Sequence, residues 1–181
     1  MKKGIKIAII VIVLCVLVFA GLYFGPNLLK KDKPVPENKD LISISSYFNG
    51  AGTVKFSGSA LFSDGSIYTW NFSGDEFTKG GYNLNTLEGV TNYILDRADE
   101  SKNVVSESDL NTIKEYINNL TEEELEFKED CRDTYNGTNT IEIVKDKEII
   151  AISETGDCNG SASSENAQEL ITILNKIFKG E

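Results

Sequence analysis

A run of twenty residues near the N-terminus, from Ile5 to Phe24, constrains this chain more than any other feature. It reads IKIAIIVIVLCVLVFAGLYF, and Lys6 is its only charge. As a helix that rises about 1.5 Å per residue it would be about 30 Å long, which matches the hydrocarbon thickness of a bilayer. The run therefore predicts a transmembrane helix that anchors the chain in a cell membrane.

The residues around this run predict its orientation. Lys2 and Lys3 precede it and favour a cytoplasmic N-terminal tail over residues 1–4. Ala20 would suit cleavage of a signal peptide, but the apolar run is longer than the usual core of such a peptide. We expect a retained, single-pass anchor over residues 5–24. The alternative is a signal peptide, whose cleavage would give a secreted protein.

Residues 25–40 separate this anchor from the rest of the chain. Their sequence, GPNLLKKDKPVPENKD, combines proline, charged and amide residues without a hydrophobic period, which is typical of a linker. The remaining part, residues 41–181, has the size of one domain. We expect this domain to be extracytoplasmic. The frequent Lys, Ile and Asn residues are typical of a bacterial protein.

The part of the chain beyond the anchor is strongly acidic. Residues 34–181 contain 12 Lys and Arg against 27 Asp and Glu, which gives a net charge near −15. Such a surface repels nucleic acid and anionic lipid headgroups, so we expect no nucleic-acid partner. A basic partner, or divalent cations bound at low affinity, would be compatible with this charge. The alternative is that this charge only keeps the protein soluble.

Cys131 and Cys158 are the only cysteines outside the apolar run. Without any histidine in the chain they cannot complete a zinc site, and they do not form a Cys-x-x-Cys redox motif. An even number of cysteines in an exported domain favours a disulfide. We therefore predict a structural disulfide between Cys131 and Cys158, which would stabilise the fold by about 3–4 kcal/mol.

The segment from Val54 to Ser73 predicts a β-hairpin. Apolar and polar residues alternate in its first half. In its second half, three aromatic residues occupy alternate positions, so that they would point to the same face of a strand. A three-residue turn ending at Gly65 keeps the apolar residues of both strands on one face. This register pairs Phe62 with Ser66, Ala60 with Tyr68, Gly58 with Trp70 and Phe56 with Phe72. An earlier strand over residues 42–48 is a weaker prediction.

A second hairpin is predicted from Thr138 to Glu154, with its turn at Asp146 and Lys147 or at the four residues around them. Its expected register pairs Ile143 with Ile150 and Ile141 with Ile152, which puts four isoleucines on one face. The other face is mostly polar, as in an antiparallel sheet that has one buried and one solvated side. Cys131 and Cys158 flank the open end of this hairpin, where Gly137 and Gly156 would permit the bend that the disulfide requires.

Three stretches have apolar residues at helical spacing. They are Leu87–Leu95, capped by Asn85 or Thr86, Leu110–Leu120, capped by Ser108, and Ser164–Phe178, which Ser163 or Ser164 caps and Gly180 ends. The acidic run Glu122–Glu124 is expected to be a solvated helix extension or a loop. The order of elements predicts an α+β fold after the transmembrane helix. Its antiparallel sheet would contain two hairpins and the earlier strand over residues 42–48, with about three helices covering one face.

The sequence contains no recognisable catalytic motif. The absence of histidine excludes Ser-His-Asp and Cys-His catalysis, and neither a phosphate-binding loop nor a dinucleotide fingerprint is present. Residues 130–139 resemble a calcium loop in composition, but Arg132 stands at the first ligand position. We therefore assign no catalytic, cofactor-binding or metal-binding residue and expect no cofactor.

Taken together, these features predict a membrane-tethered extracytoplasmic domain that binds a protein or cell-envelope partner without catalysis. Two alternatives are kept. A carboxylate-dependent hydrolase would require inward-facing Asp or Glu side chains with raised pKa values in a cleft. A structural subunit of an envelope complex would act mainly through its transmembrane helix.

Overall fold

The computed structural model describes residues 39–50, 53–76, 80–127, 130–131 and 136–180. The predicted tail, the anchor at residues 5–24 and nearly all of the linker lie outside these ranges. Within them, no helix has both the length and the apolar character needed to cross a membrane.

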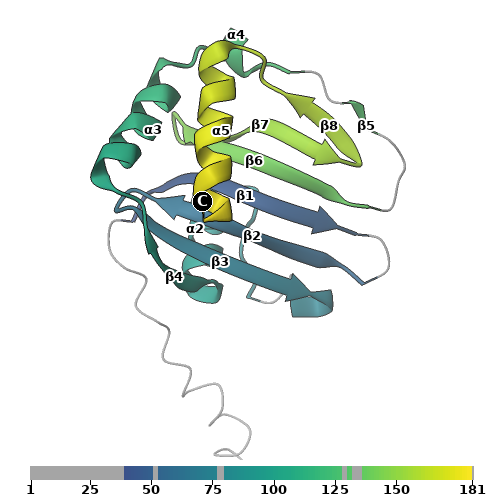
Figure 1. Cartoon of the computed structure of the whole chain (residues 1–181). Helices are drawn as coiled ribbons and strands as arrows, with labels where there is room; N and C mark the ends of the chain where they lie inside the picture. The colour runs from purple at the N-terminus through teal and green to yellow at the C-terminus, as the bar shows by residue number, and fades with distance from the viewer. Residues whose placement is uncertain (1–38, 51–52, 77–79, 128–129, 132–135, 181) are drawn as a thin grey trace, which may run out of the picture. The chain divides into compact units, whose positions relative to one another are not determined.

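The described residues form an α+β fold in which four α-helices pack on one antiparallel sheet of eight strands (Figure 1). The spatial order of the strands is β4-β3-β2-β1-β6-β7-β8-β5. The strands are β1 (Leu41–Asn49), β2 (Lys55–Phe62), β3 (Ser66–Ser73), β4 (Asp99–Val104), β5 (Asp130–Cys131), β6 (Thr138–Lys145), β7 (Glu148–Gly156) and β8 (Cys158–Ser161). The helices are α2 (Leu87–Arg97), α3 (Glu107–Asn119), α4 (Glu122–Leu125) and α5 (Glu165–Lys179), and a 3-10 turn follows β3 at Gly74–Glu76.

The first hairpin, β2–β3, has the register predicted from its sequence. Gly58 lies opposite Trp70 and Phe56 lies opposite Phe72. Gly65 has a φ angle of 83°, the left-handed conformation that the short turn requires. The weaker prediction of an earlier strand is also confirmed, because β1 pairs with β2 on one side and with β6 on the other. Strand β1 therefore joins the two hairpins into one sheet.

The second hairpin, β6–β7, differs from its predicted register at one point. Ile143 lies opposite Ile150, as expected, and the turn residues Asp146 and Lys147 have φ angles of 52° and 69°. The predicted pair of Ile141 with Ile152 is wrong. An irregularity inserts one extra residue into β7, so that Ser153 lies opposite Ile141. All four isoleucines still contact one core, because the extra residue, Ile152, is fully buried in it.

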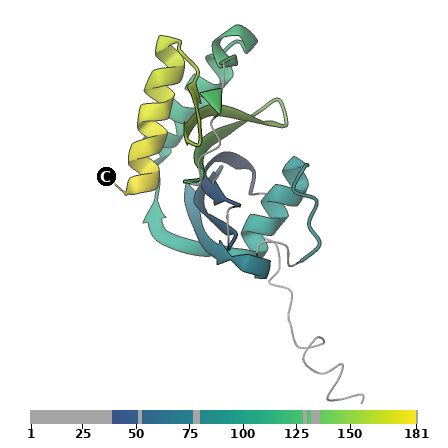
Figure 2. The ribbon, with the colours of Figure 1, turned by 90° about the vertical axis from the view of Figure 1, so that its right-hand side faces the viewer.

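The expectation that the helices cover one face of the sheet is wrong. The yellow helix α5 lies on one side of the strands and the teal helix α2 on the other (Figure 2). Isoleucines of β6 and β7 pack against α3 and α5, whereas aromatic residues of β2 and β3 pack against α2. The two hairpins thus present their main apolar side chains on opposite faces. Each face therefore needs its own cover to remove those side chains from water.

Side-chain caps define the helix ends. Thr86 accepts a hydrogen bond from Gly89 N at 3.1 Å and begins α2, and Ser164 begins α5 in the same way. Each of them is one of the two caps predicted for its helix, but Ser108 as the cap of α3 is wrong. Ser106 accepts from Asp109 N at 3.2 Å, so the helix begins two residues earlier. The acidic run forms the short helix α4.

Cys131 and Cys158 form a disulfide bond, as the sequence predicts. The chain turns back after β7 at Gly156, which has a φ angle of 122°, and β8 then pairs with both β7 and β5. The β5–β8 pair places Cys131 directly opposite Cys158. Strands β4, β5 and β8 were not predicted, because each is short or polar and lacks the alternation of a half-buried strand.

Candidate functional site

A groove of about 790 Å³ lies between helix α2 and the sheet, on the face opposite α5. Strands β1, β2, β3 and β6 contribute to its floor, α2 forms one wall, and the β6–β7 turn contributes to its rim. This volume lies in the range of small-molecule and side-chain binding sites. We refer to it as the α2 groove.

Aromatic side chains make up much of the α2 groove. Strand alternation places Phe56 of β2 and Trp70 of β3 on the α2 face, and Tyr93 of α2 faces them. The ring centroids of Phe56 and Trp70 are 5.4 Å apart, and those of Phe56 and Tyr93 are 6.4 Å apart. Gly58 lets the indole lie against the strand, because a Cβ there would come within 2.6 Å of Trp70 Cζ2.

Glu142 places a carboxyl group in this largely apolar groove. It lies on β6 opposite Ile44 of β1, and both residues line the groove. Among the residues that the structure describes, none donates a hydrogen bond or forms an ion pair with its carboxylate. Burial, assisted by the nearby charge of Glu154, raises the pKa of Glu142 above its usual range. The charged form of Glu142 would therefore be stabilised by a donor or a cation from outside the described residues.

A second polar group in the groove also has no partner among the described residues. Trp70 is buried, and its Nε1–H has no hydrogen-bond acceptor within the described ranges. A buried donor left in this state costs about 1–3 kcal/mol of stability, so such groups are rare in folded proteins. Trp70 is also the only tryptophan of the chain. Its fluorescence and its single indole N–H signal would therefore report on this groove alone.

The aromatic cluster beside the groove already holds one cation. The Arg97 guanidinium lies 4.7 Å from the centroid of the Phe72 ring and 5.3 Å from that of Tyr93. Arg97 also donates a hydrogen bond to the backbone oxygen of Glu76 at 2.6 Å. Tyr93 belongs to both the groove lining and this cation–π contact. The ring system is therefore electrostatically suited to positive charge.

The rim of the groove is accessible. Leu84, just before α2, lines the groove and is 36% exposed. Across from it, the β6–β7 turn contributes Lys147 and Glu148. No ion pair joins Lys147 to Glu142. The charged residues that line the described groove are thus two glutamates and one lysine.

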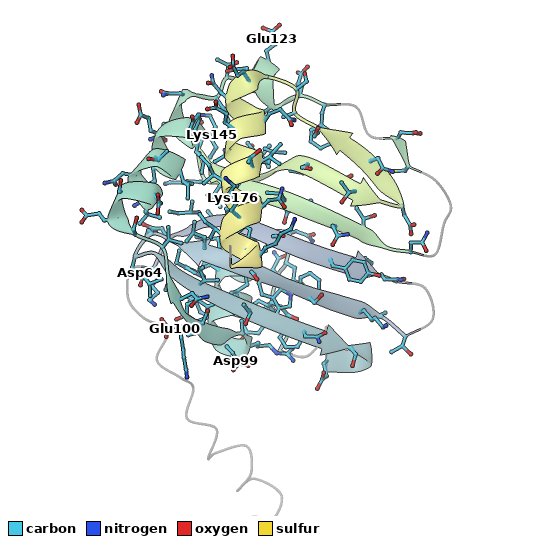
Figure 3. All side chains as sticks on the ribbon, viewed as in Figure 1. Asp64, Asp99, Glu100, Glu123, Lys145 and Lys176 are labelled. Carbon is cyan, nitrogen blue, oxygen red and sulfur yellow. A yellow bond between two sulfur atoms is a disulfide. The ribbon has the colours of Figure 1, made fainter. Side chains whose placement is uncertain are left out.

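A separate polar cluster surrounds Lys39, at the end of the predicted linker. Lys39 Nζ forms ion pairs with Asp64 at 2.9 Å and with Glu100 at 3.3 Å, and it donates hydrogen bonds to Ser66 and Tyr68. Burial lowers the pKa of Lys39, but these partners outweigh it and raise the pKa above its usual value. Figure 3 shows Asp64 and Glu100 at the edge of the sheet that β4 forms. The cluster holds the end of the predicted linker against the domain.

The predicted disulfide residues do not line the groove. Cys131 and Cys158 lie in β5 and β8, at the opposite edge of the sheet from β4. Glu142 and Trp70 were not predicted as site residues. The sequence pattern of the second hairpin places Glu142 on a solvated face, because nothing in it indicates a helix on that side. Within the described ranges, no three His, Cys, Asp or Glu side chains are grouped to hold a metal ion.

No known protein family matches this chain, and neither does any curated protein or solved structure. The residues of the α2 groove are therefore the basis for assigning a function.

Proposed function

We propose that this chain is a membrane-tethered extracytoplasmic binding module and that the α2 groove is its ligand site. The predicted anchor at residues 5–24 supports the membrane location. The disulfide between Cys131 and Cys158 supports an oxidising compartment outside the cytoplasm. The observation that carries the binding role is the groove itself, which is lined by a carboxylate without a described partner and by aromatic side chains.

This combination is typical of recognition sites. Ligand pockets are mostly apolar and contain a few polar groups that orient the ligand. In the α2 groove, Phe56, Trp70 and Val90 supply apolar surface, and Glu142 supplies the orienting charge. A bound ligand would gain from removal of apolar area from water and from a hydrogen bond to the carboxylate.

The hydrolase alternative has one observation in its favour. Glu142 lies in a groove and its pKa is raised, as a general acid requires. Hydrolysis by paired carboxylates also needs a second carboxylate across the substrate, and Glu148 at the rim is the other acidic residue that lines the groove. In a hydrolase, Glu142→Gln would abolish turnover while substrate is still bound. A binding module shows no turnover in either form.

Site-specific photocross-linking tests the binding proposal. The reactive amino acid p-benzoylphenylalanine replaces Leu84 at the groove rim, in cells that produce the full chain. The matched control replaces Lys176, an exposed residue of α5 on the opposite face of the sheet (Figure 3). We expect a discrete cross-linked species from position 84 and none from position 176. Equal products from both positions, or no product from position 84, would contradict the proposal.

The role of the anchor is tested separately. Exchanging residues 5–24 for an unrelated transmembrane helix leaves the domain and its groove unchanged. We expect cross-linking from position 84 to persist after this exchange. Loss of the cross-link, with the chain still in the membrane, would favour a structural subunit that acts through its transmembrane helix.

A further inference from the structure

We propose that the α2 groove binds a basic side chain, lysine or arginine, of a partner polypeptide. This proposal rests on the proposed function, because it takes the groove to be the ligand site, and it adds the chemical class of the ligand. A basic side chain has an apolar stem and a cationic head. The groove offers matching surfaces for both parts.

The carboxylate of Glu142 is the first reason. It lies in a groove whose other floor residues include Ile44, Phe56 and Trp70, so a charge there is poorly solvated. Burial raises the pKa of Glu142, and no described residue donates a hydrogen bond to its carboxylate or forms an ion pair with it. An ammonium or guanidinium group would donate charge-assisted hydrogen bonds to it. A neutral or anionic ligand would leave the carboxylate without this stabilisation.

The aromatic rings are the second reason. Phe56, Trp70 and Tyr93 line the groove together, and the negative faces of such rings attract cations. Arg97 demonstrates this chemistry within the same cluster, because its guanidinium lies over the rings of Phe72 and Tyr93. A groove lined by both a carboxylate and aromatic rings is an arrangement suited to an alkylammonium or guanidinium ion.

Charge complementarity is the third reason. The whole chain has a net charge of −10, so its long-range field attracts basic partners and repels acidic ones. Lys147 is the only cation among the described lining residues. It is exposed at the rim and forms no ion pair with Glu142. The carboxylate is thus not already neutralised by this lysine.

A bare metal ion fits these observations less well. Divalent cations prefer several oxygen ligands, and the described groove contributes the carboxylates of Glu142 and Glu148 with mainly apolar and aromatic neighbours. A cluster of three acidic or other metal-ligating side chains does not occur in the described part of the chain. The apolar lining instead favours an organic cation.

Calorimetric titration of the full chain in detergent micelles tests this inference. The probes are the N-acetyl methylamides of arginine and lysine, which mimic these residues within a polypeptide. The amides of citrulline and norleucine are their neutral counterparts. The variants are Glu142→Gln and the matched control Glu123→Gln, which removes the same charge from exposed helix α4 (Figure 3).

We expect the arginine and lysine amides to bind about tenfold or more tightly than their neutral counterparts, since a hydrogen bond to a charged group contributes at least this factor. Glu142→Gln should remove the difference, and Glu123→Gln should preserve it. Equal binding of charged and neutral probes would overturn the cation inference and leave the groove as a binding site. If both variants lose this affinity difference equally, general charge attraction explains it. That result would also overturn the cation inference. No binding of any probe would also overturn the cation inference, whereas the proposed function stands or falls with the cross-link from position 84.

Discussion

Gly58 lies directly opposite Trp70 in the β2–β3 pair, and the indole occupies the space where any other residue would place its Cβ. This relationship shapes the floor of the α2 groove. A large ring lies close to the strand because its partner residue has no side chain. The shape of the groove therefore depends on Gly58, although this residue does not line the groove itself.

Replacing this glycine is expected to disturb both stability and the groove. In Gly58→Ala the new Cβ would lie 2.6 Å from Trp70 Cζ2 and would also overlap the backbone oxygen of Ser45. Such overpacking costs about 1–3 kcal/mol, so the free energy of unfolding should fall by about 2 kcal/mol. Denaturant unfolding followed by Trp70 fluorescence measures it. The control Gly50→Ala, where a Cβ comes no closer than 3.4 Å to another residue, should change little. Equal effects in both variants would contradict the packing explanation.

Glu142→Gln is expected to stabilise the chain at neutral pH. The raised pKa of Glu142 means that the folded chain binds its proton more tightly than the unfolded chain does. Folding stability due to this group is therefore fully present below about pH 4.5 and is lost as pH rises through the raised pKa. The glutamine variant cannot lose it. Thermal unfolding should show a higher midpoint for the variant at pH 7 and similar midpoints at pH 4. A variant that is less stable at pH 7 would contradict the environment assigned to Glu142.

The disulfide is expected to stabilise the fold when it is formed, under oxidising conditions. The bridge joins residues 27 positions apart, and closing a loop of this length is worth about 3–4 kcal/mol in the chain-entropy model. Cys131→Ser and Cys158→Ser should each lower the free energy of unfolding by this amount in air. Both variants should be insensitive to reducing agent, which should lower the wild type to their level. If neither substitution lowers stability, the disulfide has no structural role.

Lys39→Met is expected to loosen the start of the domain. Lys39 has a side chain only 16% exposed and forms two ion pairs, but Asp64 is 42% exposed, so solvent screens part of the gain. We expect a loss of about 1 kcal/mol, measured by denaturant unfolding at pH 7. Lys102→Met removes the same charge from an exposed position of β4 and should have little effect. Equal losses would show that net charge, rather than the Lys39 cluster, is responsible.

The same cluster predicts a response to acid. Burial raises the pKa of Asp64, but hydrogen bonds from Ser66 and the ion pair with Lys39 outweigh it and lower that pKa below its usual 3.8. Its contribution to stability is therefore present above pH 3.8 and is lost as pH falls further. Lys39→Met should make unfolding less dependent on pH in this acidic range. An unchanged dependence would contradict the ion pair.

Local pattern was enough to predict the elements with strong periodicity. The register of β2–β3 followed from keeping Tyr68 and Phe72 on one face, and side-chain chemistry narrowed the caps of α2 and α5 to two candidates each, which included Thr86 and Ser164. The disulfide followed from the number of cysteines and the expected compartment. Each of these features depends on residues that are close in sequence or on a constraint with few solutions.

The α2 groove could not be predicted in this way. Its position depends on which face of the sheet each helix covers, and the separation of α2 from α5 is decided by long-range packing. Glu142 lies on the polar face in the alternating pattern of its strand, and it is buried only when the tertiary fold places other elements over that face. The sequence around Ile152 does not indicate the irregularity either. The isoleucines lie on one face both when Ile141 pairs with Ile152 and when it pairs with Ser153.

The most direct test of the α2 groove as a ligand site uses the single indole N–H signal of Trp70 in the ¹⁵N-labelled full chain. Titration with the arginine amide should move this one signal in a saturable manner, and the shift should give the same affinity as calorimetry. Glu142→Gln should abolish the movement. If the amide binds by calorimetry while the Trp70 signal stays fixed, the ligand lies elsewhere and the assignment of the groove is wrong.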